Sequence, residues 1–317
     1  MSPTLTQLHY IITLYRLRHF GRAAKVCSVT QPTLSMQIKK AEEELGFHIF
    51  DRSQNPLSPT PRGLEFIRQA MHVISAHQEL LQLKTLSSDT PTGELFVGII
   101  PTLASSIPPL FLSNFAEMYP GITLRIVEKT TDEIIDGLRS LKIDVGVLAL
   151  PLMEKGIDEQ KLFTEQFYIY AHPHEELLQY DEITVDILPM DRIWLLDKGH
   201  CLREQSLQIC DRRFEAGLLN NVRFEAGGLD TLRQVIDHVG GYTLITESYA
   251  RLLTQNVRTA QVRPFVEPLP ARSVGGAFLT NTWKKNSIQH LFSCITTSLP
   301  RSLKNFNTAH HILPIRS

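Results

Sequence analysis

The sequence predicts an α/β protein with three parts: an N-terminal winged helix-turn-helix, a long linker or dimerisation helix, and a C-terminal two-lobed α/β domain. Three observations predict this organisation. Capped helices and a polar hairpin fill the first 60 residues, an apolar seam at helical spacing follows Pro61, and apolar strands alternate with helices from Glu94 onward. We expect the helix-turn-helix at 1–60, the linker helix and hinge at 61–93, and the α/β domain at 94–317, with lobe I at 94–165 and 268–300 and lobe II at 166–267.

The composition is that of an ordinary globular protein of 317 residues, 43% of them hydrophobic and 21% charged. The long apolar stretch Leu95 to Phe115 is interrupted by three prolines, so we expect no membrane span. Arginines interrupt any apolar segment near the N-terminus, so we expect no signal peptide and a cytoplasmic location. Four cysteines in a reducing compartment argue against structural disulfides and for a sensing role, if they have one.

The first 60 residues show the signals of a helix-turn-helix. Thr4 and Gln7 form a capping box before a first helix, and a short second helix spans Phe20–Val26. Thr30 caps a third helix that ends at Gly46. The order of short helix, turn, long helix and hairpin favours a winged helix-turn-helix over a generic helical bundle with one polar face.

The third helix carries the side-chain types that bind DNA. Residues 1–70 contain nine Lys or Arg and five Asp or Glu, so this end of a chain of net charge −1 is modestly basic. A run of Glu closes the helix and would repel DNA, so its N-terminal half is expected to read the major groove. The residues predicted to contact DNA are Gln31, Pro32, Thr33, Ser35, Gln37 and Lys39, with Arg52 of the hairpin wing placed for a phosphate.

The helix after Pro61 has an apolar seam with alternating steps of three and four residues. Its members are Leu64, Ile67, Met71, Ile74, Gln78 and Leu81. This spacing predicts a coiled coil with a second copy of the chain, because the helix is expected to have little to pack on within its own chain. In such a dimer, the third helix of each copy could enter one of two successive major grooves, which lie about 34 Å apart.

From Glu94 onward the pattern predicts a parallel sheet with helical crossovers. The expected strands are Leu95–Ile100, Ile122–Val127, Asp144–Leu150, Phe167–Ala171, Ile193–Leu196, Val222–Ala226, Tyr242–Ile245 and Ser273–Leu279; the expected helices are Ile107–Met118, Asp132–Leu141, Leu229–Val239 and Trp283–Leu299. Two such lobes bind small molecules at the carboxyl ends of their strands. Thr102 and Thr131 fall at such ends; otherwise Thr102 is a loop residue and Thr131 a helix N-cap.

Two cysteines, Cys201 and Cys210, flank a segment of good helix formers. Nine helical steps separate their Cα atoms by roughly 13 Å and place the sulfurs on opposite faces. A disulfide needs Cα atoms within about 7 Å. The two sulfurs therefore cannot bond while the helix stands, and a bond between them would require the segment to refold.

Cys201 follows Gly199 and His200, near the N-terminus of this expected helix. The helix dipole, Lys198, Arg203 and a charged His200 are expected to lower the pKa of its thiol. A thiolate attacks peroxides, so Cys201 would be the attacking and Cys210 the resolving sulfur. The spacing leaves a second interpretation equally open, in which both are inert buried residues. A metal site is less favoured, because no CxxC pair or nearby HxxxH completes a ligand set, and Cys27 and Cys294 are expected to serve packing.

The chain resembles the LysR-type transcriptional regulators along nearly its whole length. The stretch Phe20–Gly46 carries Arg-Ala-Ala, Thr-Gln-Pro-Thr-Leu-Ser, Gln-Ile and Glu-Glu-Leu-Gly, which look like the DNA-binding signature of that family. Gly199–Arg203, followed by Cys210, is similar to a motif of the peroxide-sensing members, and Gly98–Thr102 matches them as well.

The resemblance implies a periplasmic-binding-protein-like regulatory domain in which Cys201 is oxidised by hydrogen peroxide and pairs with Cys210. It places Thr102, Thr131 and His200 around the peroxide, with Arg272 nearby. It also implies a homotetramer, a dimer of dimers. The partners it implies are double-stranded promoter DNA, RNA polymerase, hydrogen peroxide and a cellular thiol reductant, with no cofactor, no metal and no membrane.

The sequence thus favours a peroxide-switched DNA-binding regulator that is not an enzyme. A first alternative is a LysR-type regulator that responds to a metabolite and has incidental cysteines. A second is a thiol peroxidase, which is disfavoured because no CxxC pair or second redox domain suggests turnover. A Ser-His-Asp hydrolase has no support, since the sequence contains no GxSxG elbow.

Overall fold

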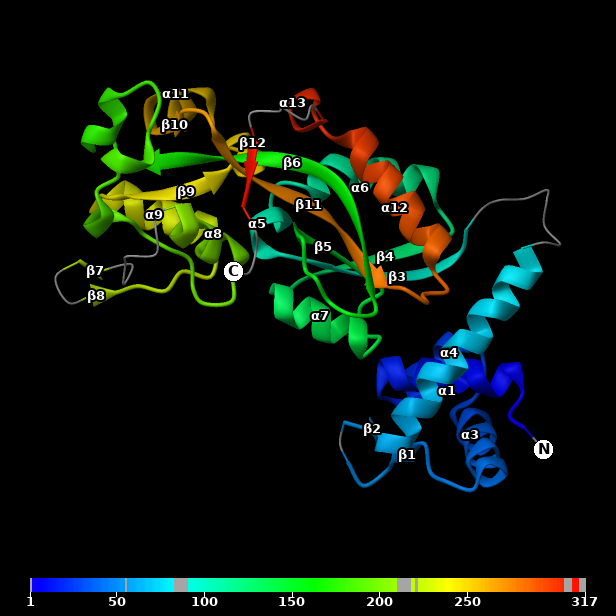
Figure 1. The fold of residues 1–317 in the computed structure, drawn as a ribbon. Helices are drawn as coiled ribbons and strands as arrows, with labels where there is room; N and C mark the ends of the chain where they lie inside the picture. Colours follow the sequence, from blue (N-terminus) through cyan, green and yellow to red (C-terminus); the bar gives the residue numbers. More distant parts are fainter. Residues whose placement is uncertain are drawn as a thin grey trace. The chain divides into compact units, whose positions relative to one another are not determined.

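The computed structural model describes residues 2–54, 56–82, 91–209, 218–219, 222–304 and 310–313 (Figure 1). The chain divides into two compact units, Met1–Thr90 with Asn281–Lys285, and Pro91–Thr280 with Asn286–Ser317. No helix in the described ranges is both long and apolar enough to span a membrane.

The N-terminal unit is a winged helix-turn-helix, as predicted. Its elements are α1 (Leu5–Leu17), α2 (Phe20–Val26), α3 (Gln31–Leu45), β1 (Phe50–Asp51), β2 (Ser58–Pro59) and α4 (Pro61–Gln82). The capping box of Thr4 and Gln7 starts α1, and the Thr33 amide donates to the Thr30 hydroxyl at 3.3 Å to start α3. Gly46 ends α3 with φ +74°, a left-handed conformation that glycine adopts without strain.

The Glu run at the end of α3 is not simply a solvated charge cluster. Glu42 is 4% exposed, and its carboxylate accepts hydrogen bonds from the backbone amides of Ile49 at 2.8 Å and Phe50 at 3.2 Å. The Arg52 guanidinium, predicted to contact a phosphate, donates to the other carboxylate oxygen at 3.1 Å and remains 44% exposed. Glu42 therefore fixes the start of the wing to the end of α3.

The expectation that α4 lacks packing partners within its own chain is wrong. Ile67, Met71 and Ile74, three members of the predicted seam, are buried where α4 packs on α1 of the same unit. The seam therefore contributes to the core of this unit, while Val73 on another side of α4 is 49% exposed. The side chains of Gln78 and Leu81 lie outside the described residues.

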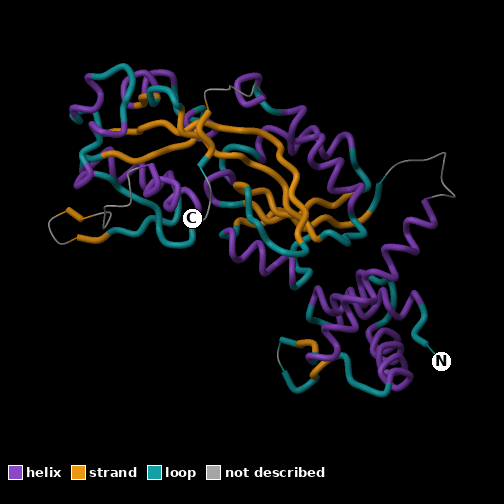
Figure 2. Tube along the Cα trace, viewed as in Figure 1, coloured by secondary structure: helices purple, strands orange, loops and turns teal. Residues whose placement is uncertain are grey.

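The C-terminal unit is built on one mixed sheet with strand order β10-β6-β11-β5-β3-β4. The strands are β3 (Gly93–Ile99), β4 (Ile122–Glu128), β5 (Val145–Leu150), β6 (Ile157–Ala171), β9 (Tyr242–Thr246), β10 (Val262–Pro264), β11 (Leu269–Leu279) and β12 (His310–Ile312), with a short hairpin of β7 (Leu218–Leu219) and β8 (Val222–Arg223). β3 lies between β4 and β5 and is parallel to both, as the parallel pattern predicted. The predicted repeat of that pattern is wrong, because β11 is antiparallel to β5 and β9 is antiparallel to β6. β6 and β11 run antiparallel and extend through the whole unit (Figure 2).

Helices cover both faces of the sheet. They are α5 (Pro101–Ala104), α6 (Pro108–Met118), α7 (Thr131–Arg139), α8 (Cys201–Ile209), α9 (Leu229–Val239), α10 (Glu247–Ala250), α11 (Gln255–Gln261), α12 (Lys285–Ser298) and α13 (Arg301–Lys304), with 3-10 turns η1 (Glu176–Gln179), η2 (Val185–Ile187) and η3 (Met190–Arg192). Figure 1 shows α6 and α12 side by side on one face of the β3–β5 region and α7 on the other. The Cys294 thiol on α12 donates to the Phe111 carbonyl on α6 at 3.7 Å, so this buried cysteine packs between helices.

Several strands differ from the prediction. Ile193–Leu196 forms only isolated bridges, Ile193 with Tyr242 and Leu196 with Ala226, although all four of its side chains are buried. The predicted strand Val222–Ala226 is reduced to Val222–Arg223. The strand predicted at Phe167 begins ten residues earlier, at Ile157, and in this added part the exposed Glu159 and Lys161 alternate with half-buried residues.

The unit contains two hydrophobic cores. Core I gathers residues between Leu95 and Phe163 with residues between Val274 and Leu303, and core II gathers residues between Phe167 and Phe265. Cys201 packs in core I, whereas the next residue, Leu202, packs in core II. The first turn of α8 thus lies where the two cores meet. Leu313, just after β12, also belongs to core II.

Glu42→Gln should loosen the wing. Removal of the carboxylate weakens a site that holds two amides and a guanidinium, so we expect the free energy of unfolding to fall by about 1–3 kcal/mol. Hydrogen exchange at the Ile49 and Phe50 amides should accelerate. Glu43→Gln is the matched control, because Glu43 is 66% exposed and pairs only with Lys39 among the described contacts; equal acceleration in both variants would contradict the anchoring role.

Candidate functional site

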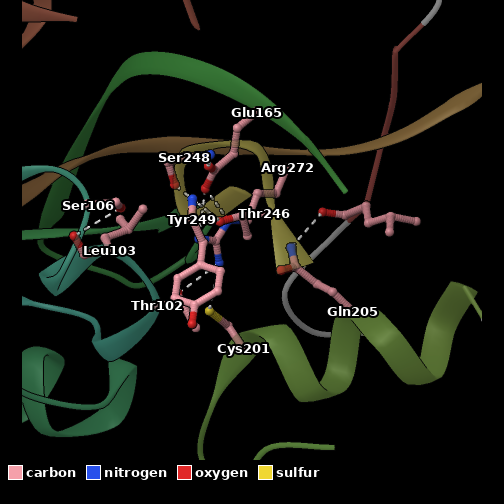
Figure 3. A network of polar contacts seen from close by, with 11 residues as sticks. Thr102, Leu103, Ser106, Glu165, Cys201, Gln205, Thr246, Ser248, Tyr249 and Arg272 are labelled. Atoms are coloured by element: carbon pink, nitrogen blue, oxygen red, sulfur yellow. Dashed lines mark hydrogen bonds and ion pairs between the residues drawn. The ribbon is translucent and has the colours of Figure 1, made fainter. Parts of the chain in front are cut away.

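The candidate site surrounds Cys201, the first residue of α8 (Figure 3). Three elements bring side chains to it. Thr102 is in α5, directly after β3; Thr131 is the first residue of α7, after β4; and Arg272 is in β11. The carboxyl ends of two parallel strands and one crossing strand therefore meet at the N-terminus of α8.

Arg272 connects the members of this site. Its side chain is wholly buried, and Nη1 donates to Thr102 Oγ1 at 3.1 Å and to Cys201 Sγ at 3.9 Å. Nε and Nη2 lie 2.8 and 2.7 Å from Glu165 Oε1. The Arg272 guanidinium therefore places a positive charge near the sulfur. The same guanidinium is paired with the buried Glu165 carboxylate.

Sequence reasoning missed Glu165, which is wholly buried on β6. Its second oxygen accepts from the Ser248 amide at 3.0 Å, and Ser248 shares a hydroxyl contact of 3.1 Å with Thr246. A signal for it was present, because alternation along a strand puts Glu165 on the same face as Phe163 and Phe167. A carboxylate flanked in this way is buried and needs a cation.

Thr131 is not the N-cap of α7. Thr130 holds that position: its hydroxyl accepts from the Glu133 amide at 3.4 Å, and the Glu133 carboxylate accepts from the Thr130 amide at 2.9 Å. A capping box forms at Thr130 because Glu133 lies three residues after it. Thr131 is then free to turn its buried hydroxyl toward Cys201, where it favours the thiolate form.

Burial raises the pKa of the Cys201 thiol above 9.0, against the expectation of a lowered value. The charge of Arg272, the Thr131 hydroxyl and the Leu202 amide oppose this effect without overcoming it. The cations named from the sequence do not help: Arg203 donates to the Leu196 carbonyl at 2.8 Å, and Lys198 is exposed. Cys201 therefore rests as a thiol near neutral pH.

His200 is also neutral near neutral pH. It is 8% exposed, and burial lowers the pKa of its imidazole below 6.5, although the charges of Asp197 and Glu128 oppose the shift. Its Nδ1 has no hydrogen-bond partner among the described residues. The expected contribution of a charged His200 to the thiolate is thus absent, and its free nitrogen remains available to a small polar molecule.

Gln205, one turn after Cys201, ties α8 to the end of the chain. It is wholly buried, and its Nε2 donates to the Leu313 carbonyl at 3.4 Å, while its Oε1 has no partner in the described ranges. The Leu313 amide in turn donates to the Ala271 carbonyl at 2.9 Å, next to Arg272. The last described residues therefore border the site. Cys210 lies outside the described residues.

Six of the seven predicted DNA-contacting residues lie on α3 with graded exposure, and the seventh, Arg52, directly follows β1. Gln31, Pro32 and Lys39 are exposed, whereas Thr33, Ser35 and Gln37 are half-buried; the Gln37 side chain accepts from Gln7 Nε2 at 3.2 Å. Met36, which the sequence reasoning did not select, is 62% exposed between Ser35 and Gln37.

A winged helix-turn-helix followed by a two-core α/β unit with a buried polar site is the organisation of a bacterial transcription regulator with a ligand-binding domain. Residues 5–64 match the model of the bacterial regulatory helix-turn-helix proteins of the LysR family, and residues 88–300 match that of the LysR substrate binding domain. The chain belongs to the LysR family.

Relatives within this family include peroxide regulators. The hydrogen peroxide-inducible genes activator of Haemophilus influenzae is 27% identical over 92% of this chain and 96% of its own length. The DNA-binding transcriptional dual regulator OxyR of Escherichia coli K12 is 30% identical over 86% of this chain and 88% of its own length. The HTH-type transcriptional regulator EstR of Acinetobacter baylyi is also 30% identical, over 94% and 97%.

Solved structures of OxyR proteins share the fold. A full-length Pseudomonas aeruginosa OxyR with a cysteine-to-aspartate substitution has a TM-score of 0.79 and 31% identity, covering 93% of this chain and 98% of that one. A hydrogen peroxide-bound Corynebacterium glutamicum OxyR with a cysteine-to-serine substitution has a TM-score of 0.59 and 28% identity, with 94% of each chain covered.

Substitutions of the adjacent Thr130 and Thr131 should have different effects. Thr131→Val removes a hydroxyl that favours the Cys201 thiolate, so iodoacetamide should label Cys201 about tenfold more slowly, with little change in stability. Thr130→Val removes the cap, so the free energy of unfolding should fall by about 1 kcal/mol while labelling stays normal. Slower labelling in Thr130→Val alone would reverse the assignment.

The protein should lose stability in mild acid partly through His200. Because folding lowers the pKa of this imidazole, its contribution is fully present above pH 6.5 and is lost as the pH falls through the lower folded-state value. His200→Gln should reduce the loss of unfolding free energy between neutral and acidic pH, measured by urea denaturation. His174→Gln, at an exposed position, should leave that dependence unchanged; equal effects would contradict the assignment.

Proposed function

We propose that this chain is a DNA-binding transcription regulator that senses hydrogen peroxide through Cys201. The observation that carries the proposal is a buried thiol at a helix N-terminus, 3.9 Å from the wholly buried guanidinium of Arg272. Relatives named as hydrogen peroxide-inducible activators and a peroxide-bound structural neighbour support this choice of ligand.

The chemistry follows from the groups around the sulfur. As peroxide enters, the Cys201 sulfur attacks one oxygen, the O–O bond breaks, and the second oxygen leaves with the thiol proton as water. The product is a sulfenic acid on Cys201. Arg272 stabilises the negative charge that develops on the sulfur, and the hydroxyls of Thr102 and Thr131 and the free nitrogen of His200 orient the peroxide.

The second step is an intramolecular exchange. The Cys210 thiol attacks the Cys201 sulfenic sulfur, an S–S bond forms, and a second water leaves, so one peroxide is reduced while two thiols are oxidised. α8 runs from Cys201 to Ile209, eight helical steps or roughly 12 Å, so we expect it to unwind when the two sulfurs bond. Unwinding withdraws Leu202, Gln205 and Ile209 from buried positions and alters the surface that other protomers meet.

The remaining assignments complete the regulator. We assign DNA binding to residues 1–60, pairing between protomers to the linker at 61–93, and sensing to 94–317, with lobes I and II divided as predicted. The bases and phosphates of promoter DNA are bound by the N-terminal half of α3 and by the wing. A tetramer, contact with RNA polymerase and reduction by a cellular thiol system complete the cycle in the cytoplasm.

A metabolite-responsive regulator is the second candidate, and one observation favours it. The regulator EstR, whose name does not refer to peroxide, is 30% identical to this chain, as is the OxyR of Escherichia coli. In that case a saturable small ligand would change DNA binding while the number of free thiols stayed constant during a peroxide pulse.

Cys201→Ser should abolish peroxide-dependent transcription while leaving DNA binding in the reduced state intact, because only the reacting sulfur is lost. Reporter transcription and DNA footprinting before and after a short peroxide pulse measure both. Cys294→Ser is the matched control, since Cys294 is also buried but lies between α6 and α12. A fully responsive Cys201→Ser protein would refute the mechanism.

A further inference from the structure

Arg272 has two anionic or potentially anionic partners at unequal distances. Two of its nitrogens lie 2.7–2.8 Å from one oxygen of Glu165, whereas the Cys201 sulfur is 3.9 Å from Nη1. Both members of the ion pair are 0% exposed, so water screens neither charge. By contrast, Arg192 in its pair with Glu175 keeps 47% of its side chain exposed.

The pair delivers less than a full positive charge to the sulfur. In a water-excluded interior, interactions between charges fall off slowly with distance, so the carboxylate behind the guanidinium cancels much of its field at Sγ. The thiolate is therefore stabilised mainly by the dipole of the Arg272–Glu165 ion pair, and not by a full positive charge. Burial raises the pKa of the Cys201 thiol, and the charge of Arg272 opposes this effect without overcoming it.

Glu165 is held in place by the strand and by the neighbouring helix. It stands directly opposite Arg272 in the antiparallel register of β6 and β11, and its second oxygen accepts from the Ser248 amide at the start of α10. Figure 3 shows Glu165, Arg272 and Cys201 in line, with Thr102 beside the guanidinium. Neither carboxylate oxygen is free to rotate away from this arrangement.

We propose that Glu165 is a positioning residue that orients Arg272 toward Thr102 and Cys201 and withholds part of its charge from the sulfur. Cys201 then remains a thiol at rest, and the sulfur becomes anionic only during its attack on peroxide. This inference rests on the proposed role of Cys201 as the reacting sulfur. Stability alone does not explain the pair, because buried ion pairs add little over well-packed apolar residues.

The test compares single and double charge removal in the full-length chain. Glu165→Gln leaves Arg272 uncompensated, so Cys201 should react with iodoacetamide about tenfold faster at pH 7, and its pH profile should move to lower pH. Glu165→Gln with Arg272→Gln removes both charges, so Cys201 should react more slowly than in the unmodified chain. Mass spectrometry of the Cys201 peptide measures the rate.

The opposite directions of these shifts separate charge from structure. If the pair served only to hold β6 to β11, both variants would move the profile in the same direction or leave it unchanged, and either result overturns the proposal. Glu159→Gln is the matched control, an exposed glutamate on the same strand, and should give the profile of the unmodified chain.

A graded variant covers the case in which Glu165→Gln does not fold. Glu165→Asp keeps the charge but withdraws it by one methylene, so Cys201 should become more reactive, by less than tenfold; an unchanged or slower reaction overturns the proposal. Alkylation uses neither peroxide nor DNA. A failure of peroxide sensing at Cys201 would therefore appear in the transcription assay and not in these rates.

Discussion

The sharing of one guanidinium among three partners is the constraint on which the site depends. Arg272 reaches Thr102, Cys201 and Glu165 from a single, wholly buried position on β11. Because Cys201 packs in core I and Leu202 in core II, this guanidinium also lies where the two cores meet. A change in the charge or position of the sulfur therefore affects residues in both core I and core II.

Burial gives Cys201 properties that an exposed reactive thiol lacks. At 5% exposure the sulfur is inaccessible to bulky oxidants, and its raised pKa keeps it protonated and slow toward weak electrophiles. In the function we propose, selectivity toward a small oxidant comes from buried polar groups already in place beside the sulfur, such as those of Thr131 and His200. In this arrangement discrimination comes from geometry, and not from a permanently ionised sulfur.

Local sequence signals predicted the local structure well, but they did not predict which residues on distant strands become partners. Thr30 and Gly46 delimit α3 as expected, and Cys201 does begin a helix. Thr131 was misassigned because two threonines in a row both suit a cap, and the decisive residue was Glu133. The partnership of Glu165 with Arg272 joins strands 107 residues apart in sequence, and no local pattern encodes which strands become neighbours. The placement of Arg272 near Cys201 came from family resemblance and not from spacing.

The hydrogen bond between Leu313 and α8 has a practical consequence for sensors built on this chain. The Leu313 carbonyl accepts from Gln205 on α8. A fluorescent reporter inserted beside Leu313 would be tethered almost directly to the helix whose unwinding we propose. Fusions meant to monitor that change therefore belong at sites away from Leu313.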